Sequence, residues 1–151
     1  MVEYAKTQGL KFVASNVPRR YANTVYHNGL EILDSLSPYA KIFMADLPLR
    51  IDTGIQIYQE MLQMVPDHSN ANLVYSQGLK DATMAYFILM NKNSEEIFLH
   101  INGSYHSKNK QGILSFLKNF PLEKTLSIQT ILKDKAEEND FSQADYTIVN
   151  L

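Results

Sequence analysis

Two short polar segments hold the residues of this chain that are best suited to chemistry. One contains Arg19, Arg20 and Tyr21, and the other ends at His106 in a Gly-Ser-Tyr-His sequence. Nearby positive charge favours ionisation of a phenol, and a phenolate is a hard oxygen ligand that suits ferric iron, including haem iron. A histidine can bind a metal or act as a base when neutral, and it can hold an anion when protonated. The structural alternative is that the arginines pair with surface carboxylates, Tyr21 packs, and His106 is only solvated.

The elements before these two segments predict that the segments meet. Each follows a short apolar run, residues 11–15 and 97–101, that we expect to be a buried strand. Parallel neighbouring strands would release both polar segments at the carboxyl-end edge of one sheet, where open α/β sheets place their ligand sites. The pattern therefore predicts a site built from residues more than eighty positions apart.

A third contribution is expected from the clearest helix of the chain, over residues 71–90. Gln77, Lys80, Asp81 and Met84 form one stripe at three- and four-residue spacing. A right-handed crossover would begin this helix near the same edge of the sheet. Lys80 is either a surface lysine paired with Asp81 or a point charge for an anionic ligand.

The order of the predicted elements indicates an α/β fold with a largely parallel sheet flanked by helices. Further strands are expected over residues 126–132 and 146–149, and a short helix over residues 111–119. The interval between the first two strands is too long for a simple crossover. We therefore expect one domain over residues 1–151, with a small helical subdomain at about 34–70.

Composition excludes several classes of function. The 151 residues carry a formal charge of −2 without a basic stripe, which argues against nucleic acid as a partner. The chain has no cysteine, so disulfides, Cys-ligated zinc and thiolate nucleophiles are excluded. No run approaches membrane-spanning length and the first residues lack a signal-peptide core, so we expect a soluble chain. His27, His68 and His100 show no spacing typical of a metal cluster, and His100 is expected to be a buried, hydrogen-bonded strand residue.

Three separated motifs, taken in order, resemble the ChaN family of haem-binding lipoproteins within the wider Tiki/ChaN-like haem-uptake superfamily. They are residues 16–22 (NVPRRYA), 77–85 (QGLKDATMA), and 102–107 (NGSYHS) with Gly112. Residues 144–148 (ADYTI) also resemble the last strand of the family. The resemblance implies a parallel sheet flanked by helices with a small helical subdomain.

The same resemblance implies that the chain binds haem (Fe protoporphyrin IX) during iron acquisition. A tyrosine would be the axial ligand, a histidine and a lysine would hold the propionates, and haem would be linked to formation of a homodimer with two stacked haems. Carried onto this sequence, Tyr21 is the expected iron ligand, with Tyr75 and Tyr105 as alternatives, and Lys80 and His106 are the expected propionate contacts. The remaining candidate haem contacts are Arg19, Arg20, Gln77 and Met84. Full-length members are periplasmic or membrane-anchored lipoproteins, so an outer-membrane haem receptor is a further expected partner.

The resemblance departs from the family at the start of the chain. Family members continue upstream with a lipoprotein signal, a first strand and a Gly-Glu-x-His type motif, whereas Met1 aligns with an interior position. We therefore expect the C-terminal part of such a fold, with a sheet edge that a dimer partner or another chain would cover.

Three hypotheses follow. The leading one is a haem-binding transport protein that is not an enzyme. The second is a metal-dependent hydrolase relative of the Tiki/erythromycin-esterase type that uses His106 and acidic partners. The third is an inactive fragment or interaction module in which the motifs only stabilise turns.

Overall fold

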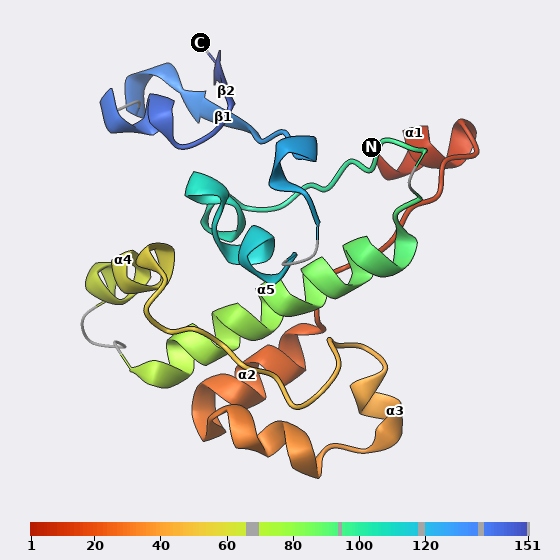
Figure 1. The fold of residues 1–151 in the computed structure, drawn as a ribbon, viewed down its shortest axis with the longest axis vertical. Helices are drawn as coiled ribbons and strands as arrows, with labels where there is room; N and C mark the ends of the chain where they lie inside the picture. Colours follow the sequence, from red (N-terminus) through yellow and green to blue (C-terminus); the bar gives the residue numbers. More distant parts are fainter. Residues whose placement is uncertain (66–69, 94, 118–119, 136–137, 151) are drawn as a thin grey trace.

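The structure is a computed structural model that describes residues 1–65, 70–93, 95–117, 120–135 and 138–150. His68 and the last two residues of the helix predicted over 111–119 lie outside the described residues. Helix α5 (Ala71–Asn91) crosses the middle of the molecule, and the other elements pack around it (Figure 1). The side chain of Asn70 caps α5 by accepting a hydrogen bond from the amide of Leu73 (3.1 Å). Between residues 76 and 85, Lys80 alone is not buried, so α5 is the centre of the core.

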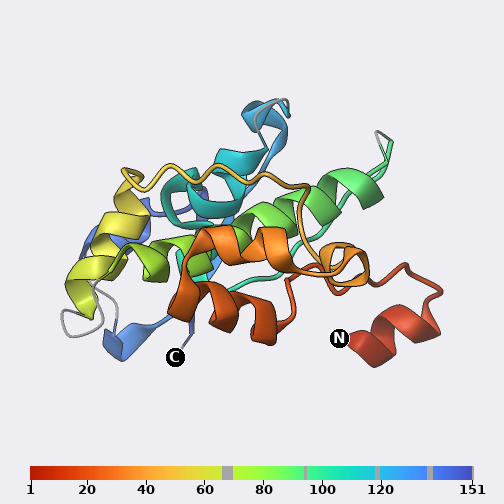
Figure 2. The same cartoon turned by 90° about the horizontal axis from the view of Figure 1, so that it is seen from below.

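One side of α5 is covered by the N-terminal helices. Helix α2 (Arg19–Asn28) packs against it (Figure 2). The Ser76 hydroxyl donates a hydrogen bond to the carbonyl of Ala22 (2.8 Å). The chain continues through the 3₁₀ segment η1 (Leu30–Ser35) and helix α3 (Pro38–Lys41). The buried residues of this side are Val17, Ala22, Val25, Leu33, Met44 and Leu79. This packing fixes the start of α2 beside the middle of α5.

The other side of α5 is covered by helix α4 (Gln56–Met64) and by three 3₁₀ turns. These turns are η3 (Ser104–His106), η4 (Lys108–Lys110) and η5 (Gly112–Phe116). The helix predicted over residues 111–119 is therefore a 3₁₀ segment where the structure describes it. Its buried face packs with α5 in a cluster of Met84, Ala85, Ile88, Ile113 and Leu117.

The sheet has two parallel strands within the described part of the chain, β1 (Ile128–Leu132) and β2 (Tyr146–Asn150). Ile128 pairs with Tyr146, and the register continues to Leu132 and Asn150. Short 3₁₀ segments, η6 (Leu122–Lys124), η7 (Lys133–Lys135) and η8 (Glu138–Ser142), flank or connect the strands. The α/β class with a parallel sheet is confirmed, and so are the strands predicted over residues 126–132 and 146–149.

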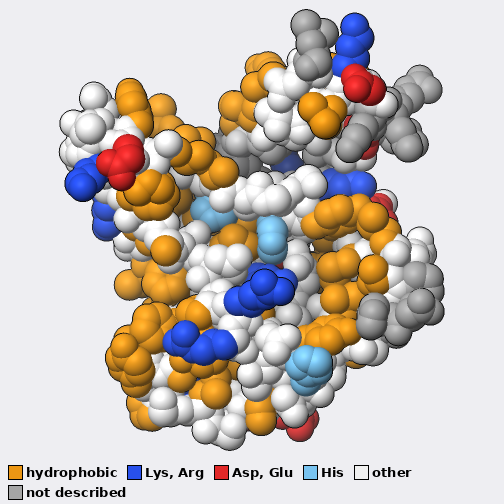
Figure 3. Space-filling model, turned by 180° about the vertical axis from the view of Figure 1, so that it is seen from behind, with side chains coloured by type: hydrophobic (Ala, Val, Ile, Leu, Met, Phe, Trp, Pro, Cys, Tyr) orange, Lys and Arg blue, Asp and Glu red, His pale blue; other side chains and the backbone are white. Residues whose placement is uncertain are grey.

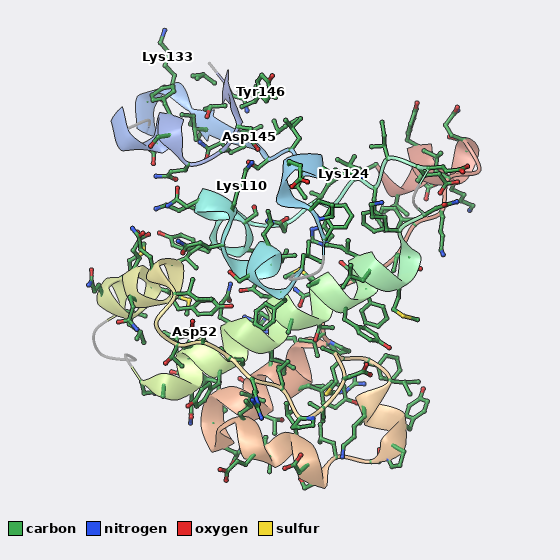
Figure 4. All side chains as sticks on the ribbon, in the orientation of Figure 1. Asp52, Lys110, Lys124, Lys133, Asp145 and Tyr146 are labelled. Carbon is green, nitrogen blue, oxygen red and sulfur yellow. The ribbon has the colours of Figure 1, made fainter. Side chains whose placement is uncertain are left out.

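Asp145 joins this sheet to the helical body. Its carboxylate accepts hydrogen bonds from the Ser127 amide and hydroxyl (both 2.8 Å) and pairs with the ammonium of Lys110 (2.8 Å). Figure 4 labels Asp145 and Lys110 at this junction. The ion pair and then the Ser127 hydrogen bonds lower the pKa of Asp145 to about 2.

The strands predicted over residues 11–15 and 97–101 are wrong. In the described residues both segments are extended but neither forms a strand ladder, and the link between them is a hydrogen bond of the Ser15 hydroxyl with His100 Nε2 (2.9 Å). The apolar alternation is present, but Ile97 (100% exposed) and Leu99 (77% exposed) face solvent. A strand needs a partner backbone as well as an apolar pattern, and no described segment supplies one here.

Two other features complete the description. Helix α1 (Val2–Thr7) precedes Gly9, which has a positive φ of 65°. The helical subdomain expected at about 34–70 stays a prediction, although α3 and α4 both lie in that range. Within the described residues, no helix is both long and apolar enough to cross a membrane.

Candidate functional site

A buried carboxylate on α5 organises the candidate site. Asp81 is 0% exposed, and its Oδ2 accepts a hydrogen bond from the Tyr58 hydroxyl of α4 (2.8 Å). Its other oxygen contacts Nδ1 of His106, at the end of η3. Gln77, one turn earlier on α5, places its Nε2 3.0 Å from the same His106 nitrogen. Two side chains of α5, one of them bonded to Tyr58 of α4, therefore hold the His106 ring in one orientation.

Burial sets the electrostatics of this network. Burial raises the pKa of Asp81, while His106 and then Tyr58 act in the opposite direction. Burial, and next the neighbouring Asp81, raises the pKa of Tyr58 well above its ordinary value. The hydroxyl therefore stays protonated and donates a hydrogen bond to the carboxylate. Because Asp81 and Gln77 occupy the Nδ1 side of His106, Nε2 is the ring nitrogen left for an outside ligand.

Gly112 lets the chain pass closely behind His106. Its φ is +59°, and a Cβ at this position would lie 2.5 Å from the His106 carbonyl oxygen and 3.3 Å from Asp81 Oδ2. Both the positive φ and the close approach require glycine. The glycine in the third motif therefore has a structural reason tied to the site.

Arg19 and Lys80 bring a second group of charges to this region. Lys80 is half-buried, and burial lowers its pKa, Asp81 raises it, and the positive charge of Arg19 lowers it further. The start of α2 and the middle of α5 thus lie near enough for these two cations to repel each other. His100 is also close enough to His106 for their charges to interact.

We call Arg19, Lys80, His100 and His106 the basic cluster. Figure 3 shows lysine, arginine and histidine side chains gathered in the middle of one face, with hydrophobic side chains on either side. Ser15, just before the first polar segment, bonds His100, just before the second, and Arg19 lies near Lys80; the convergence of Tyr21 with His106 stays a prediction.

Tyr21 lies on the first turn of α2, two positions after Arg19. An Nη of Arg20 donates a hydrogen bond to its hydroxyl (3.1 Å), and the guanidinium lies 4.6 Å from the ring centroid. The ring is partly buried against the core cluster that contains Val25 and Leu79. A guanidinium is thus held next to the phenol oxygen.

The other candidates differ in position. The Tyr105 hydroxyl donates to Met64 Sδ (2.8 Å), and Met84 is 3% exposed in the core. Tyr75 lines a separate cavity of about 440 Å³, which does not include Tyr21, Lys80 or His106. The residues that line it are Asn28, Gly29, Leu30, Glu31, Arg50, Ile51 and Tyr75.

Sequence reasoning missed two features of the site. It did not identify Tyr58 as the partner of Asp81, since a tyrosine in an amphipathic helix gives no local signal. It also did not name Ser15 and Asn102 as the partners of His100, which it expected to be a buried, hydrogen-bonded strand residue.

The donor set fits haem better than a metal ion held only by side chains. A phenol beside a guanidinium suits ferric iron, and half-buried cations suit carboxylates. Among the described residues, no three or more His, Asp or Glu side chains are grouped so that they could hold a metal ion.

Comparison with known families agrees with this chemistry. A family model described as haem-binding uptake, Tiki superfamily, ChaN, matches residues 1–117. The chain belongs to this family. The ChaN match covers α1 to η5, and therefore every candidate residue named above, whereas β1 and β2 lie beyond it. No curated protein and no solved structure matches the chain.

Proposed function

We propose that this protein carries haem, with the propionates on Lys80 and His106 and the iron on Tyr21. The observation that supports the proposal is the convergence of Arg19, Lys80 and His106 beside the helix that carries Tyr21, in a chain of the ChaN family. In this proposal haem is cargo and not the substrate of a reaction.

The propionate contacts follow from the charges. Lys80 is half-buried and the exposed Arg19 lowers its pKa, so a carboxylate between the two would relieve their repulsion and favour the charged form of Lys80. His106 offers Nε2 from a ring whose orientation Asp81 and Gln77 fix. Two acidic groups on one ligand match this arrangement.

The iron contact follows from the pair of Arg20 and Tyr21. The Arg20 guanidinium donates a hydrogen bond to the Tyr21 hydroxyl oxygen (3.1 Å), and a tyrosine oxygen is a ligand that suits ferric haem iron. When bound, haem supplies a ferric ion that accepts an axial oxygen ligand. Tyr75 and Tyr105 stay as alternatives, but the Tyr105 hydroxyl is already engaged with Met64.

The dimer and the receptor complete the proposal. We infer from the family resemblance that haem binding is linked to homodimerisation and that an outer-membrane haem receptor is the partner. The many exposed apolar side chains, among them Leu99, Ile101 and Ile148, leave surface that a partner would cover.

A hemin titration of the purified chain tests the proposal. We expect a saturable, high-spin, tyrosinate-type spectrum together with a monomer-to-dimer shift in sedimentation. Tyr21→Phe should abolish this spectrum, whereas Tyr75→Phe and Tyr105→Phe should retain it. If Tyr21→Phe retains the spectrum and Tyr75→Phe or Tyr105→Phe loses it, the iron ligand is that other tyrosine and not Tyr21.

The propionate contact has its own control. Lys80→Met should weaken hemin binding by about 1.5–3 kcal/mol, or roughly tenfold to a hundredfold in Kd. The same variant should leave the affinity for hemin dimethyl ester unchanged, because the ester has no carboxylates. An equal loss for both ligands would show that Lys80 acts through the fold.

A further inference from the structure

Ser15, His100 and Asn102 form a hydrogen-bonded chain of side chains outside the proposed haem contacts. The Ser15 hydroxyl lies 2.9 Å from His100 Nε2, and His100 Nδ1 lies 3.0 Å from the amide oxygen of Asn102. Ser15 and His100 are 85 positions apart in the sequence. A hydroxyl, a base and a group that orients the base are thus within hydrogen-bond reach in that order.

The bonds of Asn102 determine which nitrogen of His100 carries the proton. The Asn102 Nδ2 group donates to the carbonyl of Gly103 (2.8 Å) and to the Ser107 hydroxyl (2.9 Å). Its oxygen must therefore face His100, where it accepts the Nδ1 proton. This leaves a lone pair on Nε2, which accepts the hydrogen bond of the Ser15 hydroxyl.

The surroundings keep His100 in the form that can remove a proton. Burial lowers the pKa of His100, Asn102 raises it, and the charge of His106 lowers it. The imidazole is therefore neutral near pH 7. Ser15 and His100 are both only partly buried.

We propose that Ser15 is a nucleophile, with His100 as its general base and Asn102 as the residue that positions His100, and that this site hydrolyses carboxylic esters. The Ser15 oxygen would bond to the ester carbonyl carbon while its proton moves to His100 Nε2. The bond from that carbon to the alcohol oxygen would then break, and the alcohol would leave with the proton from His100. Water, deprotonated by His100, would release the carboxylic acid and restore Ser15.

The activity is separate from haem binding, because it uses none of the proposed haem contacts. The structural alternative is that the three side chains only tie residues 11–15 to residues 97–101. The two differ in reactivity, since a serine that serves only as a tether is no more nucleophilic than water.

A fluorophosphonate probe tests the proposal on the whole chain. We expect one adduct in the intact mass, with loss of fluoride, and peptide mapping should place it on Ser15. Mapping of the unaltered protein needs no variant, so it stays informative if Ser15→Ala fails to fold. Absence of an adduct on Ser15 in the folded protein would overturn the proposal.

Variants separate the roles of the three residues. Removal of a general base costs about a hundredfold to ten-thousandfold, so His100→Gln should slow labelling of Ser15 by at least a hundredfold. Asn102→Leu should slow it as well, whereas Asn102→Asp, which keeps an acceptor for Nδ1, should retain it. Ser104→Ala, an exposed serine in the neighbouring turn, is the matched control and should label as the unaltered protein does. If Ser15 is labelled at an unchanged rate in His100→Gln, His100 is not its general base and the proposal is refuted.

A burst of nitrophenolate from p-nitrophenyl acetate provides the second readout. We expect about one equivalent per chain before slower turnover, and no burst in Ser15→Ala or in chain already labelled by the probe. The burst assay contains no hemin and the hemin titration contains no ester, so failure of the haem proposal and failure of this one are distinguishable.

Discussion

Replacement of Gly112 by alanine tests the close approach that positions His106. A Cβ at Gly112 would lie 2.5 Å from the carbonyl oxygen and 2.8 Å from the carbonyl carbon of His106. These are backbone atoms, which cannot rotate away as the end of a side chain could. The backbone of η3 must therefore move, or η5 must leave its place against α5.

The expected loss has two parts. An L-residue at φ +59° costs roughly 1–2 kcal/mol, and crowding in a packed region costs about 1–3 kcal/mol more. Gly112→Ala should therefore lower the free energy of unfolding by about 2–5 kcal/mol, a large share of the roughly 5–15 kcal/mol of an ordinary domain.

Gly9→Ala is the matched control. Gly9 has a nearly equal φ of +65°, but nothing lies within 4 Å of a Cβ placed there. It should lose at most the conformational part, about 1–2 kcal/mol. Urea denaturation followed by circular dichroism measures both variants. Equal losses in the two would refute the close contact between Gly112 and His106.

Three further predictions concern the buried network, a helix cap and the link to the sheet. Tyr58→Phe removes the hydroxyl that donates to Asp81 and should cost about 1–3 kcal/mol of unfolding free energy in urea; a change of only a few tenths would contradict the hydrogen bond. Asn70→Ala removes the cap of α5 and should cost about 1 kcal/mol, which Asn70→Ser should largely restore. Asp145 has a pKa of about 2, below the roughly 3.9 of an unfolded aspartate. Its contribution to stability is therefore present above about pH 4 and is lost as the pH falls towards 2. Asp145→Asn should flatten the pH dependence in that interval, and an unchanged slope would show that the pair with Lys110 is not formed in solution.

Much of the fold could be predicted because its strongest patterns are local. The helix predicted over residues 71–90 ends within one residue of α5, since its apolar periodicity is long and an asparagine caps it. Strands β1 and β2 follow from short runs rich in β-branched residues. The meeting of Arg19 with Lys80 was also predictable, because these residues lie within the motifs at residues 16–22 and 77–85, which were expected near one edge of the fold.

The missing parts depend on partners that no local pattern identifies. Residues 97–101 alternate as a strand does, but pairing depends on another backbone. Tyr58 meets Asp81 across 23 positions because α4 packs on α5, which is a property of the tertiary structure. The positive φ of Gly112 and its close approach to His106 likewise belong to the tertiary structure, although this glycine stands in the third motif.

The near-complete burial of residues 76–85 of α5 limits the positions at which a substitution could change the ligand that this protein binds. Over residues 76–85 only Lys80 reaches the surface, so most random substitutions there would be lost through unfolding before any new specificity could be selected. Arg19 and Arg20 on the first turn of α2, and Ser104 in the turn that ends at His106, are exposed. Laboratory evolution towards other acidic ligands should therefore accumulate substitutions in these two segments and at Lys80, while the other residues of α5 between 76 and 85 stay unchanged.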